Sequence, residues 1–239
     1  MAKEFTRPDG RKVDELREIE AKVGIVPNAD GSAMFRSGNT IAIAAVYGPK
    51  KMHPQHQQNP AKGVLRCTYN MMSFSVTDRI RPGINRRSTE ISKITQWALE
   101  PVVLLEDYPG QVIDVFIHII QADAGTRTAG INAASLALAD AGMSMKDLIT
   151  SIAVGKVSDK IVVDLDKDEE DHEDGATDLP MAMSTRTGEI TLLQMDGNMT
   201  QKEIKEAVEM GMKACLDIKK VQVEALKAKY KGAGKWKNM

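Results

Sequence analysis

One stretch with the chemistry of an anion site lies at residues 121–130, QADAGTRTAG, where an apolar run gives way to small residues. Gly125 lets the backbone approach a ligand closely, and Thr126 and Thr128 bring hydroxyls to the unpaired amides of a first helical turn. Arg127 adds a planar guanidinium that matches phosphate oxygens. Because helix N-termini favour anions, the junction suits phosphate, although it lacks the lysine of a Walker loop. The same residues also suit a threonine cap with a surface arginine.

A second stretch, TDRIRPGINRRSTEISK at 77–93, gathers positive charge around a Pro-Gly turn. Its arginines are Arg79, Arg81, Arg86 and Arg87. Basic grooves follow the backbone of single-stranded nucleic acid, so such a loop beside a phosphate site indicates a ligand with several phosphates. Arg66, on a preceding predicted strand, is a candidate to join them. Taken alone, the cluster also fits a solvated surface.

Nine carboxylates and one lysine occupy residues 164–178, DLDKDEEDHEDGATD. An EF-hand loop would need glycine and glutamate at its sixth and twelfth positions, which here hold Glu169 and Gly175. Most of the segment therefore fits a solvated acidic loop. Asp178 differs because it stands where the loop enters the apolar run LPMAM. A carboxylate at such an edge is held rigidly and partly desolvated, as a general acid or metal ligand requires.

The histidines and cysteines offer less chemistry. His53 and His56 in MHPQH resemble a ligand pair, but no third ligand is nearby in the sequence. His118 falls in a predicted buried strand and is expected to be a satisfied core residue. Cys67 and Cys215 are far apart and have no recognisable base beside them, which disfavours a disulfide scaffold and a thiol nucleophile.

The spacing of apolar residues predicts the elements that must position these groups. Strands are predicted within 31–49, on both sides of a turn at 37–39, and at 63–76, 111–123, 150–157 and 159–166, with a hairpin at 179–196. Helices are predicted from near Asn85 to Glu100, over 124–142, and from a Thr200–Glu203 capping box to about Lys229. Strands precede helices rather than alternating strictly with them, which favours an α+β layered domain.

Composition is ordinary for a globular chain of 239 residues, with 42% hydrophobic and 27% charged residues. The acidic segment carries a formal charge of −8, so the rest carries +7 of the net −1. A basic body with one acidic segment is expected of a polyanion binder. No apolar run approaches the ~18 residues of a membrane span. The N-terminus lacks a signal-peptide core, so we expect a cytoplasmic protein with no membrane partner. One domain is expected over 1–230, with a basic, disordered tail at 231–239.

Together these blocks resemble the ribonuclease PH family. The resemblance covers nearly the whole chain and is carried by FTRPDGRKVDELREI, FRSGNTIAIAAVYGPKKMHPQH, FSVTDRIRPGINRRSTEISK and QADAGTRTAGINAASLALADAG. Within the family, MHPQH after YGPK is similar to the catalytic subunit of the archaeal exosome rather than to the bacterial tRNA-trimming enzyme. The resemblance implies an α+β, two-layer ribonuclease PH-type fold (ribosomal protein S5 domain 2-like), with mixed sheets packed on helices.

The resemblance also implies phosphorolysis, in which inorganic phosphate attacks the last phosphodiester of an RNA 3′ end and releases a nucleoside diphosphate. The residues that would bind this phosphate are, by motif, Gly125, Thr126, Arg127 and Thr128. Those that would bind the RNA backbone are Arg66, Arg86 and Arg87. Asp178, with Asp171 as a second acid, would act as general acid or bind Mg²⁺.

Two departures from the family pattern bear on these assignments. The position six residues before Asp178, where the family places its second acid, holds His172, and Asp171 lies one residue earlier. The position two after Arg66, where exosome subunits carry another arginine, holds Thr68. The family pattern therefore matches this sequence less closely at the second acid and at the RNA contact of this strand.

The implied assembly is a hexameric ring in which catalytic subunits alternate with a related non-catalytic subunit, capped by RNA-binding proteins. The alternatives are a non-catalytic scaffold subunit of the ring and a free-standing tRNA 3′-end trimming ribonuclease PH. A scaffold subunit should have lost the arginine of the phosphate site or the aspartate of TDLP, and both are present. The MHPQH stretch disfavours the free-standing enzyme.

Overall fold

The computed structural model describes residues 7–172 and 175–231. Its larger sheet has the order β1-β2-β3-β5-β4. The strands are β1 (Ile19–Val23), β2 (Gly31–Ser37), β3 (Thr40–Lys51), β4 (Val64–Met71) and β5 (Gln111–Gln121). All neighbours are antiparallel except β4 and β5, which run parallel.

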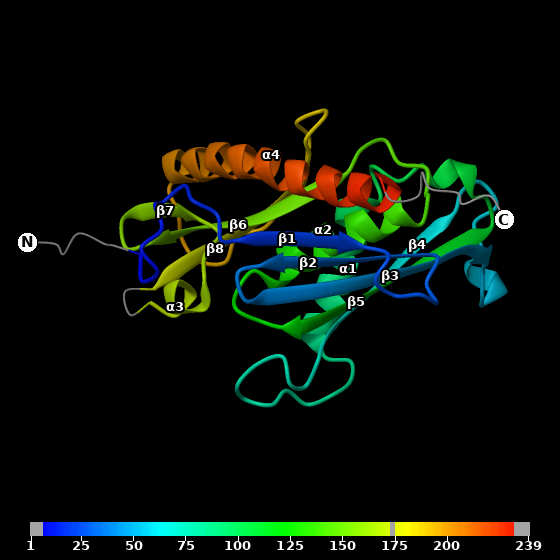
Figure 1. The fold of residues 1–239 in the computed structure, drawn as a ribbon, viewed down its shortest axis with the longest axis horizontal. Helices are drawn as coiled ribbons and strands as arrows, with labels where there is room; N and C mark the ends of the chain where they lie inside the picture. The colour runs from blue at the N-terminus through cyan, green and yellow to red at the C-terminus, as the bar shows by residue number, and fades with distance from the viewer. Residues whose placement is uncertain (1–6, 173–174, 232–239) are drawn as a thin grey trace, which may run out of the picture.

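The smaller sheet is antiparallel throughout and has the order β7-β6-β8-β9. Its strands are β6 (Ile149–Val157), β7 (Lys160–Val163), β8 (Ala176–Ser184) and β9 (Ile190–Leu193). The helices are α1 (Arg86–Leu99), α2 (Thr126–Asp140), α3 (Lys167–Glu170) and α4 (Gln201–Lys231), with short 3₁₀ turns at Gln55–Gln57 and Leu105–Asp107. Figure 1 shows α4 running along the outside of the molecule.

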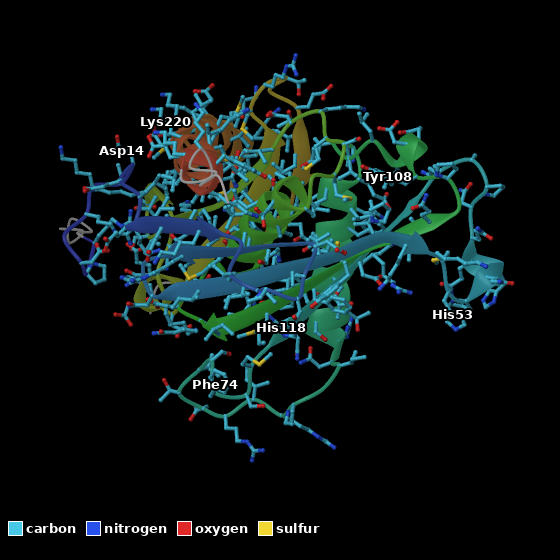
Figure 2. All side chains as sticks on the ribbon, turned by 45° about the vertical axis from the view of Figure 1, so that its right-hand side comes forward. Asp14, His53, Phe74, Tyr108, His118 and Lys220 are labelled. Atoms are coloured by element: carbon cyan, nitrogen blue, oxygen red, sulfur yellow. The ribbon has the colours of Figure 1, made fainter. Side chains whose placement is uncertain are left out.

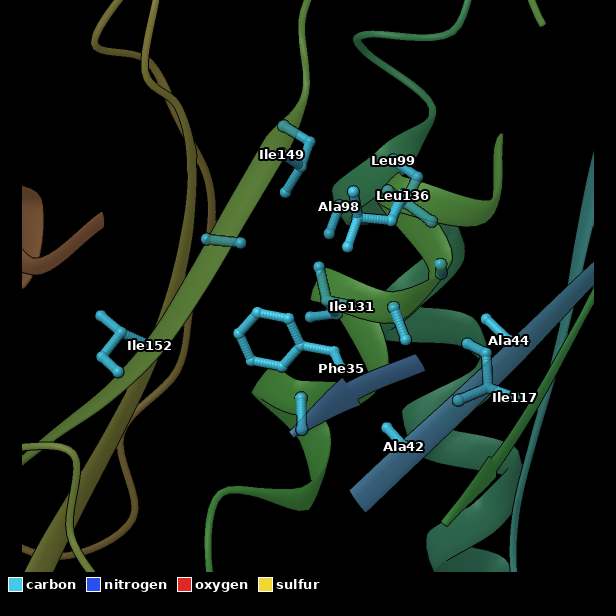
Figure 3. Packing of buried hydrophobic residues seen from close by; sticks show 14 of the residues in the cluster. Phe35, Ala42, Ala44, Ala98, Leu99, Ile117, Ile131, Leu136, Ile149 and Ile152 are labelled. Atoms are coloured by element: carbon cyan, nitrogen blue, oxygen red, sulfur yellow. The ribbon is translucent and has the colours of Figure 1, made fainter. Parts of the chain in front are cut away.

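Helix α2 forms the centre of the fold because it contacts strands of both sheets. Its sequence, rich in alanine with Ile131, Leu136 and Leu138, is buried on nearly every side. Figure 3 shows Phe35 of β2 beside Ile131 of α2, with Ile149 on the side of β6 that faces α2. A helix that is apolar all round must lie inside a protein, and here it joins two sheets through one core.

Gly31 shows how closely α2 approaches the larger sheet. A Cβ at this position would lie 2.2 Å from the amide nitrogen of Ala141 and 2.5 Å from the carbonyl oxygen of Ala137. The backbone of β2 therefore packs directly against the C-terminal end of α2.

The structure confirms the predicted α+β fold and most of its elements. Two were missed: β1, whose IEAKV mixes charged and apolar residues, and α3, hidden in the acidic run. The strand predicted at 63–76 ends at Met71, and the chain up to α1 forms a loop that projects from the body in Figure 1. Helix α4 extends to Lys231, so the predicted disordered tail at 231–239 is wrong at its first residue; residues 232–239 of that tail lie outside the described residues.

Candidate active site

The start of α2 presents backbone amides without a side-chain cap. Gly125 is the N-cap residue with φ 61°, and no side chain of the described chain caps the helix there. Ala124 before it is also left-handed, with φ 56°. The Thr128 hydroxyl donates to the Gly125 carbonyl at 2.8 Å, so this hydroxyl supports the turn. The amides of the first turn remain able to bind an anion.

Two cavities meet at this helix start. The larger, about 480 Å³, lies between the projecting loop and α2; its lining includes Thr77, Ile80, Arg87, Gly125, Thr126 and Glu170. The smaller, about 320 Å³, is lined by Arg87, Arg127, Leu165, Glu170, Asp171, Ala176, Asp178, Asp196 and Gly197. Arg87 and Glu170 line both, so the cavities are adjacent parts of one region.

Asp178 is placed by β8, within the strand rather than at its entrance as the sequence suggested. Its backbone exchanges hydrogen bonds with Asp196, at 2.9 and 2.8 Å. Its side-chain Oδ1 is buried without a hydrogen-bond partner in the described chain. Burial raises the pKa of Asp178; the charges of Arg127 and Arg87 oppose this rise, whereas Asp196 adds to it. The carboxyl group is thereby suited to hold a proton above the usual pH range of aspartate.

Arg127 also has a buried polar atom without a partner. Its Nε lacks a hydrogen-bond acceptor among the described residues. Arg127 lines the Asp178 cavity from the first turn of α2, and Arg87 does so from the first turn of α1, whose N-cap is Asn85. Two arginines and a helix start therefore face a space that suits phosphate groups, beside the four acids Glu170, Asp171, Asp178 and Asp196.

Two of the predicted RNA-binding residues lie outside these cavities. Arg86 is exposed beside Arg87 and lines neither of them. Arg66 forms a bidentate pair with Asp114, at 2.6 and 3.0 Å. Arg66 lies five residues before Met71, which lines the larger cavity, and this is about 16 Å along an extended strand.

The acidic segment contains a residue that the sequence did not single out. Glu170 lines both cavities, and its pKa is raised by burial and by the charge of Asp178. Asp171 lines only the smaller cavity and forms an exposed ion pair with Lys167 at 2.7 Å. A signal was present, since the Asp166–Glu169 capping box starts α3 and thereby orients the next residue.

The N-terminal block RPDGR holds α3 in place. Arg7 forms a bidentate pair with Glu169, at 2.7 and 2.8 Å, and both side chains are buried. Arg7 also donates to the carbonyl oxygens of Val163 and Asp164. This specific block of the sequence thus supports the acidic side of the site from a distance of 162 positions.

The remaining histidines and cysteines lie outside the cavities. Figure 2 shows His53 far from the projecting loop that carries Phe74. The prediction of a satisfied core position for His118 is wrong: the residue is half-buried, its Nδ1 lacks a hydrogen-bond partner in the described chain, and burial lowers its pKa. Its side of β5 is only partly covered. Both cysteines are free and buried, and burial raises the pKa of the Cys215 thiol to about 12.

The described residues contain no cluster of metal-ligating side chains. Within 7–172 and 175–231, no group of three or more His, Cys, Asp or Glu residues is arranged to hold a metal ion. Among the helices of the same residues, none is both long and apolar enough to cross a membrane.

Comparisons with known proteins match this chain along most of its length. The model of the 3′ exoribonuclease family, domain 1, matches residues 15–144, and that of domain 2 matches residues 147–214. The chain is 52% identical over 224 residues to exosome complex component Rrp41 of Thermococcus gammatolerans, covering 94% of this chain and 89% of that protein. It is 50% identical over 232 residues to the Methanopyrus kandleri protein of the same name, covering 97% and 96%.

Solved structures have the same fold. Rice (Oryza sativa) Rrp46 superposes with a TM-score of 0.83 at 25% identity, covering 92% of this chain and 100% of that one. A chain of the Archaeoglobus fulgidus exosome gives 0.77 at 21% identity, covering 90% and 92%. The family models, the relatives and the fold agree, and the chain belongs to the 3′ exoribonuclease family named after ribonuclease PH.

Proposed function

We propose that this chain is the phosphorolytic 3′→5′ exoribonuclease subunit of an exosome ring. It would use inorganic phosphate to release nucleoside diphosphates from RNA 3′ ends and, in reverse, extend RNA from diphosphates. Membership of the exoribonuclease family and half-identical relatives named as exosome components support the proposal. The observation that carries it is that Asp178, a buried carboxyl group, and two arginines, Arg87 and Arg127, line one cavity beside the start of α2.

In the proposed reaction the nucleophile is the phosphate itself, so no side chain of the protein needs to attack the RNA. The first-turn amides of α2 and the Arg127 guanidinium would bind the phosphate and hold one oxygen in line with the terminal phosphorus of the RNA. A new P–O bond forms as the bond from phosphorus to the leaving O3′ breaks, and the products are a nucleoside diphosphate and a shortened RNA. The protein contributes positioning and charge neutralisation.

Asp178 would protonate the leaving O3′. Its raised pKa, due first to burial, keeps a proton on the carboxyl group to a higher pH than in water. In the reverse direction the same carboxylate would accept the proton of the attacking 3′-hydroxyl. One residue thereby serves both directions, as reversibility requires.

The carboxylates also fit a magnesium ion. Mg²⁺ is usually bound by one or two carboxylates together with substrate phosphates, so a site without three protein ligands is suitable. In this alternative to the acid role, a deprotonated Asp178, whose Oδ1 has no partner in the described chain, and Asp171 of the same cavity would hold the ion. When bound, the ion neutralises charge on the phosphate oxygens.

The RNA would approach along the arginines. Arg87 lines both cavities and would contact the terminal phosphates, and Arg86 on the same helix turn would contact the next phosphate. Arg66 lies further along β4 and would bind RNA upstream. In the ring, the chain would alternate with a related non-catalytic subunit beneath RNA-binding cap proteins. We do not favour a scaffold role for the chain itself, because Arg127 and Asp178 are both present and face one cavity.

The test supplies labelled poly(A) and magnesium to the chain, alone and with its paired subunit, with and without phosphate. We expect ADP as the product and an absolute requirement for phosphate. AMP as the product, or decay without phosphate, would mean hydrolysis and would overturn the proposal. A preparation carrying Asp178→Asn, purified in parallel, reports any contaminating nuclease.

A further inference from the structure

The turn that leads into α2 has a backbone conformation that its sequence does not favour. Ala124 and Gly125 are both left-handed, with φ 56° and 61°. Glycine accepts this region freely, but alanine avoids it because its Cβ approaches a carbonyl oxygen. Contacts from other segments must therefore hold Ala124 in place.

Arg17 supplies one set of these contacts. Its Nη1 donates to the carbonyl oxygen of Asp123 at 2.5 Å, and its Nη2 donates to Oδ1 of Asp164 at 2.7 Å. The backbone amide of Arg17 donates to the other carboxylate oxygen of Asp164 at 2.9 Å. Arg17 is 8% exposed and Asp164 is 2% exposed. Burial is the largest single effect on the pKa of Arg17 and lowers it. The charge of Asp164 and the hydrogen bond to it raise this pKa, and the net shift is upward.

Thr40 supplies the second set. Its hydroxyl oxygen lies 2.8 Å from the carbonyl oxygen of Asp123 and 2.7 Å from that of Ala124, and it accepts from the Asp123 amide at 2.9 Å. Thr40 is fully buried at the start of β3. We refer to Arg17, Thr40 and Asp164 as the turn brace.

Arg17 itself lies outside the cavities of the active site. Its Nη2 is 3.2 Å from the position that a Cβ on Gly125 would occupy. However, Arg17 lines a third cavity of about 330 Å³, with Asp9, Arg11 and Asp123, and neither of the two cavities described above. Its influence on a bound phosphate must therefore pass through the turn.

The turn brace also reaches the acidic side of the site. Asp164 directly follows β7 and begins the segment that carries Glu170 and Asp171. Its carbonyl oxygen accepts from Arg7 and Arg11 of the N-terminal block, each at 3.0 Å. One buried ion pair thus connects the turn before α2 to the segment that leads to α3.

We propose that Arg17 is a positioning residue, which together with Thr40 and Asp164 holds the Asp123–Gly125 turn so that the α2 amides face the phosphate. The inference rests on the proposed function, since its effect is an effect on phosphate binding. It assigns to Arg17 and Thr40 a role in phosphate affinity although neither touches the substrate.

The test measures the KM for phosphate, kcat and the dissociation constant for poly(A) in the assembled enzyme. Arg17→Lys keeps the charge but loses the planar fork that spans the two acceptors, so we expect the KM for phosphate to rise about tenfold. Thr40→Val keeps the shape and removes the hydroxyl, and a rise of similar size is expected. Thr40→Ser restores the hydroxyl and should return the KM to within about twofold of wild type. The dissociation constant for poly(A) should not change in any of them.

Thr150→Val is the matched control. Thr150 is also fully buried, and its hydroxyl lies 3.4 Å from a carbonyl oxygen, that of Met183 in the smaller sheet. A KM for phosphate that stays at the wild-type value in both Arg17→Lys and Thr40→Val would overturn the inference. So would a rise equalled by Thr150→Val, or a parallel loss of poly(A) affinity, because either would indicate general damage.

Failure of this inference can be told apart from misfolding of a variant and from failure of the proposed function. If Arg17→Lys fails to fold, the Thr40→Val and Thr40→Ser pair decides the question without disturbing a buried charge. If wild-type enzyme releases ADP only with phosphate but the brace variants keep their KM, this inference fails and the proposed function stands. If wild-type enzyme shows no phosphate dependence, the proposed function itself fails.

Discussion

Asp178 and Arg127 each bury a polar atom that has no hydrogen-bond partner in the described chain. An unsatisfied buried polar group costs roughly 1–3 kcal/mol, and such groups persist where a ligand completes them. Here a phosphate would accept from Arg127, and a protonated Asp178 would donate to the departing oxygen. The chain is therefore expected to gain stability when it binds phosphate and RNA.

Asp178→Asn should abolish turnover while leaving RNA binding nearly intact. Loss of a general acid lowers rates by about 10²–10⁴-fold. Because the folded-state pKa of Asp178 is raised, its carboxyl group opposes folding: the penalty grows as pH rises from the unfolded-state pKa, is complete above the folded-state pKa, and is absent below both. The variant should thus match or exceed the thermal stability of wild type at pH 8, and this advantage should shrink toward pH 4. Phosphorolysis of poly(A) and thermal melts at both pH values measure these effects.

Asp171→Asn is the comparison for this variant. Its side chain is 65% exposed and paired with Lys167, so we expect a smaller loss, about tenfold, through weaker magnesium binding. Equal losses in the two variants would show that the carboxylates act as one unit. Near-normal turnover in Asp178→Asn would refute our assignment of the acid.

Arg127→Ala and Arg66→Ala should separate the two ligands. The first removes the guanidinium beside the α2 amides, so the KM for phosphate should rise by about 10–100-fold, as for a lost charged hydrogen bond. The second would remove the proposed contact of Arg66 with an RNA phosphate, so RNA binding should weaken and its salt dependence should fall by about one charge. Phosphate and poly(A) titrations at several salt concentrations measure both. If Arg127→Ala weakened RNA binding and Arg66→Ala raised the KM for phosphate, the assignment of the two arginines would be contradicted.

Among the elements, α3 depends most on its surroundings. A helix of four residues is far below the ~12–15 needed for stability alone, so its capping box and the Arg7–Glu169 pair must hold it. The pair fixes the segment that presents Glu170 to both cavities. The N-terminal block therefore belongs to the support of the site.

Glu169→Gln should reduce the free energy of unfolding by about 3–5 kcal/mol, because it leaves Arg7 charged and buried without its partner. Lys167→Ala, which removes an exposed pair on the same helix, should change it by less than about 1 kcal/mol. Urea unfolding measures both values. Similar values for the two variants would mean that the buried pair does not hold α3.

At the scale of the whole molecule, the predictions that the structure confirms are those that rested on local sequence patterns. The strands and helices with clear periodicity formed as predicted, and Arg127 and Asp178 share a cavity. The sequence did not reveal Arg17 as a support of the turn, because its partner Asp164 lies 147 positions away. Glu170 was missed for another reason: nothing in its residue type separates it from its acidic neighbours until α3 gives it a direction. Pairing over such distances depends on the whole fold.

Gly31→Ala tests the packing of the two sheets through α2. Replacing a strand glycine normally stabilises by roughly 0.5–1 kcal/mol, but this Cβ would lie 2.2 Å from the backbone of Ala141. Since that backbone cannot move without moving α2, we expect a net loss of about 1–3 kcal/mol. Gly142→Asn, at a left-handed position with open space, should change little. Denaturant unfolding compares them, and a stabilised Gly31→Ala would contradict the close packing.

The position of α2 between the sheets has a consequence for dividing the chain. Arg127 comes from the segment matched by the first family model and Asp178 from that matched by the second, so neither segment alone contains the cavity. Two fragments separated near residue 146 would each be inert, and turnover would return only if they reassembled around α2. The rate of phosphorolysis by the mixed fragments would then report how well α2 packs between the two sheets. Substitutions at core residues that pack against α2, such as Phe35 and Ile149, should accordingly reduce turnover as well as stability.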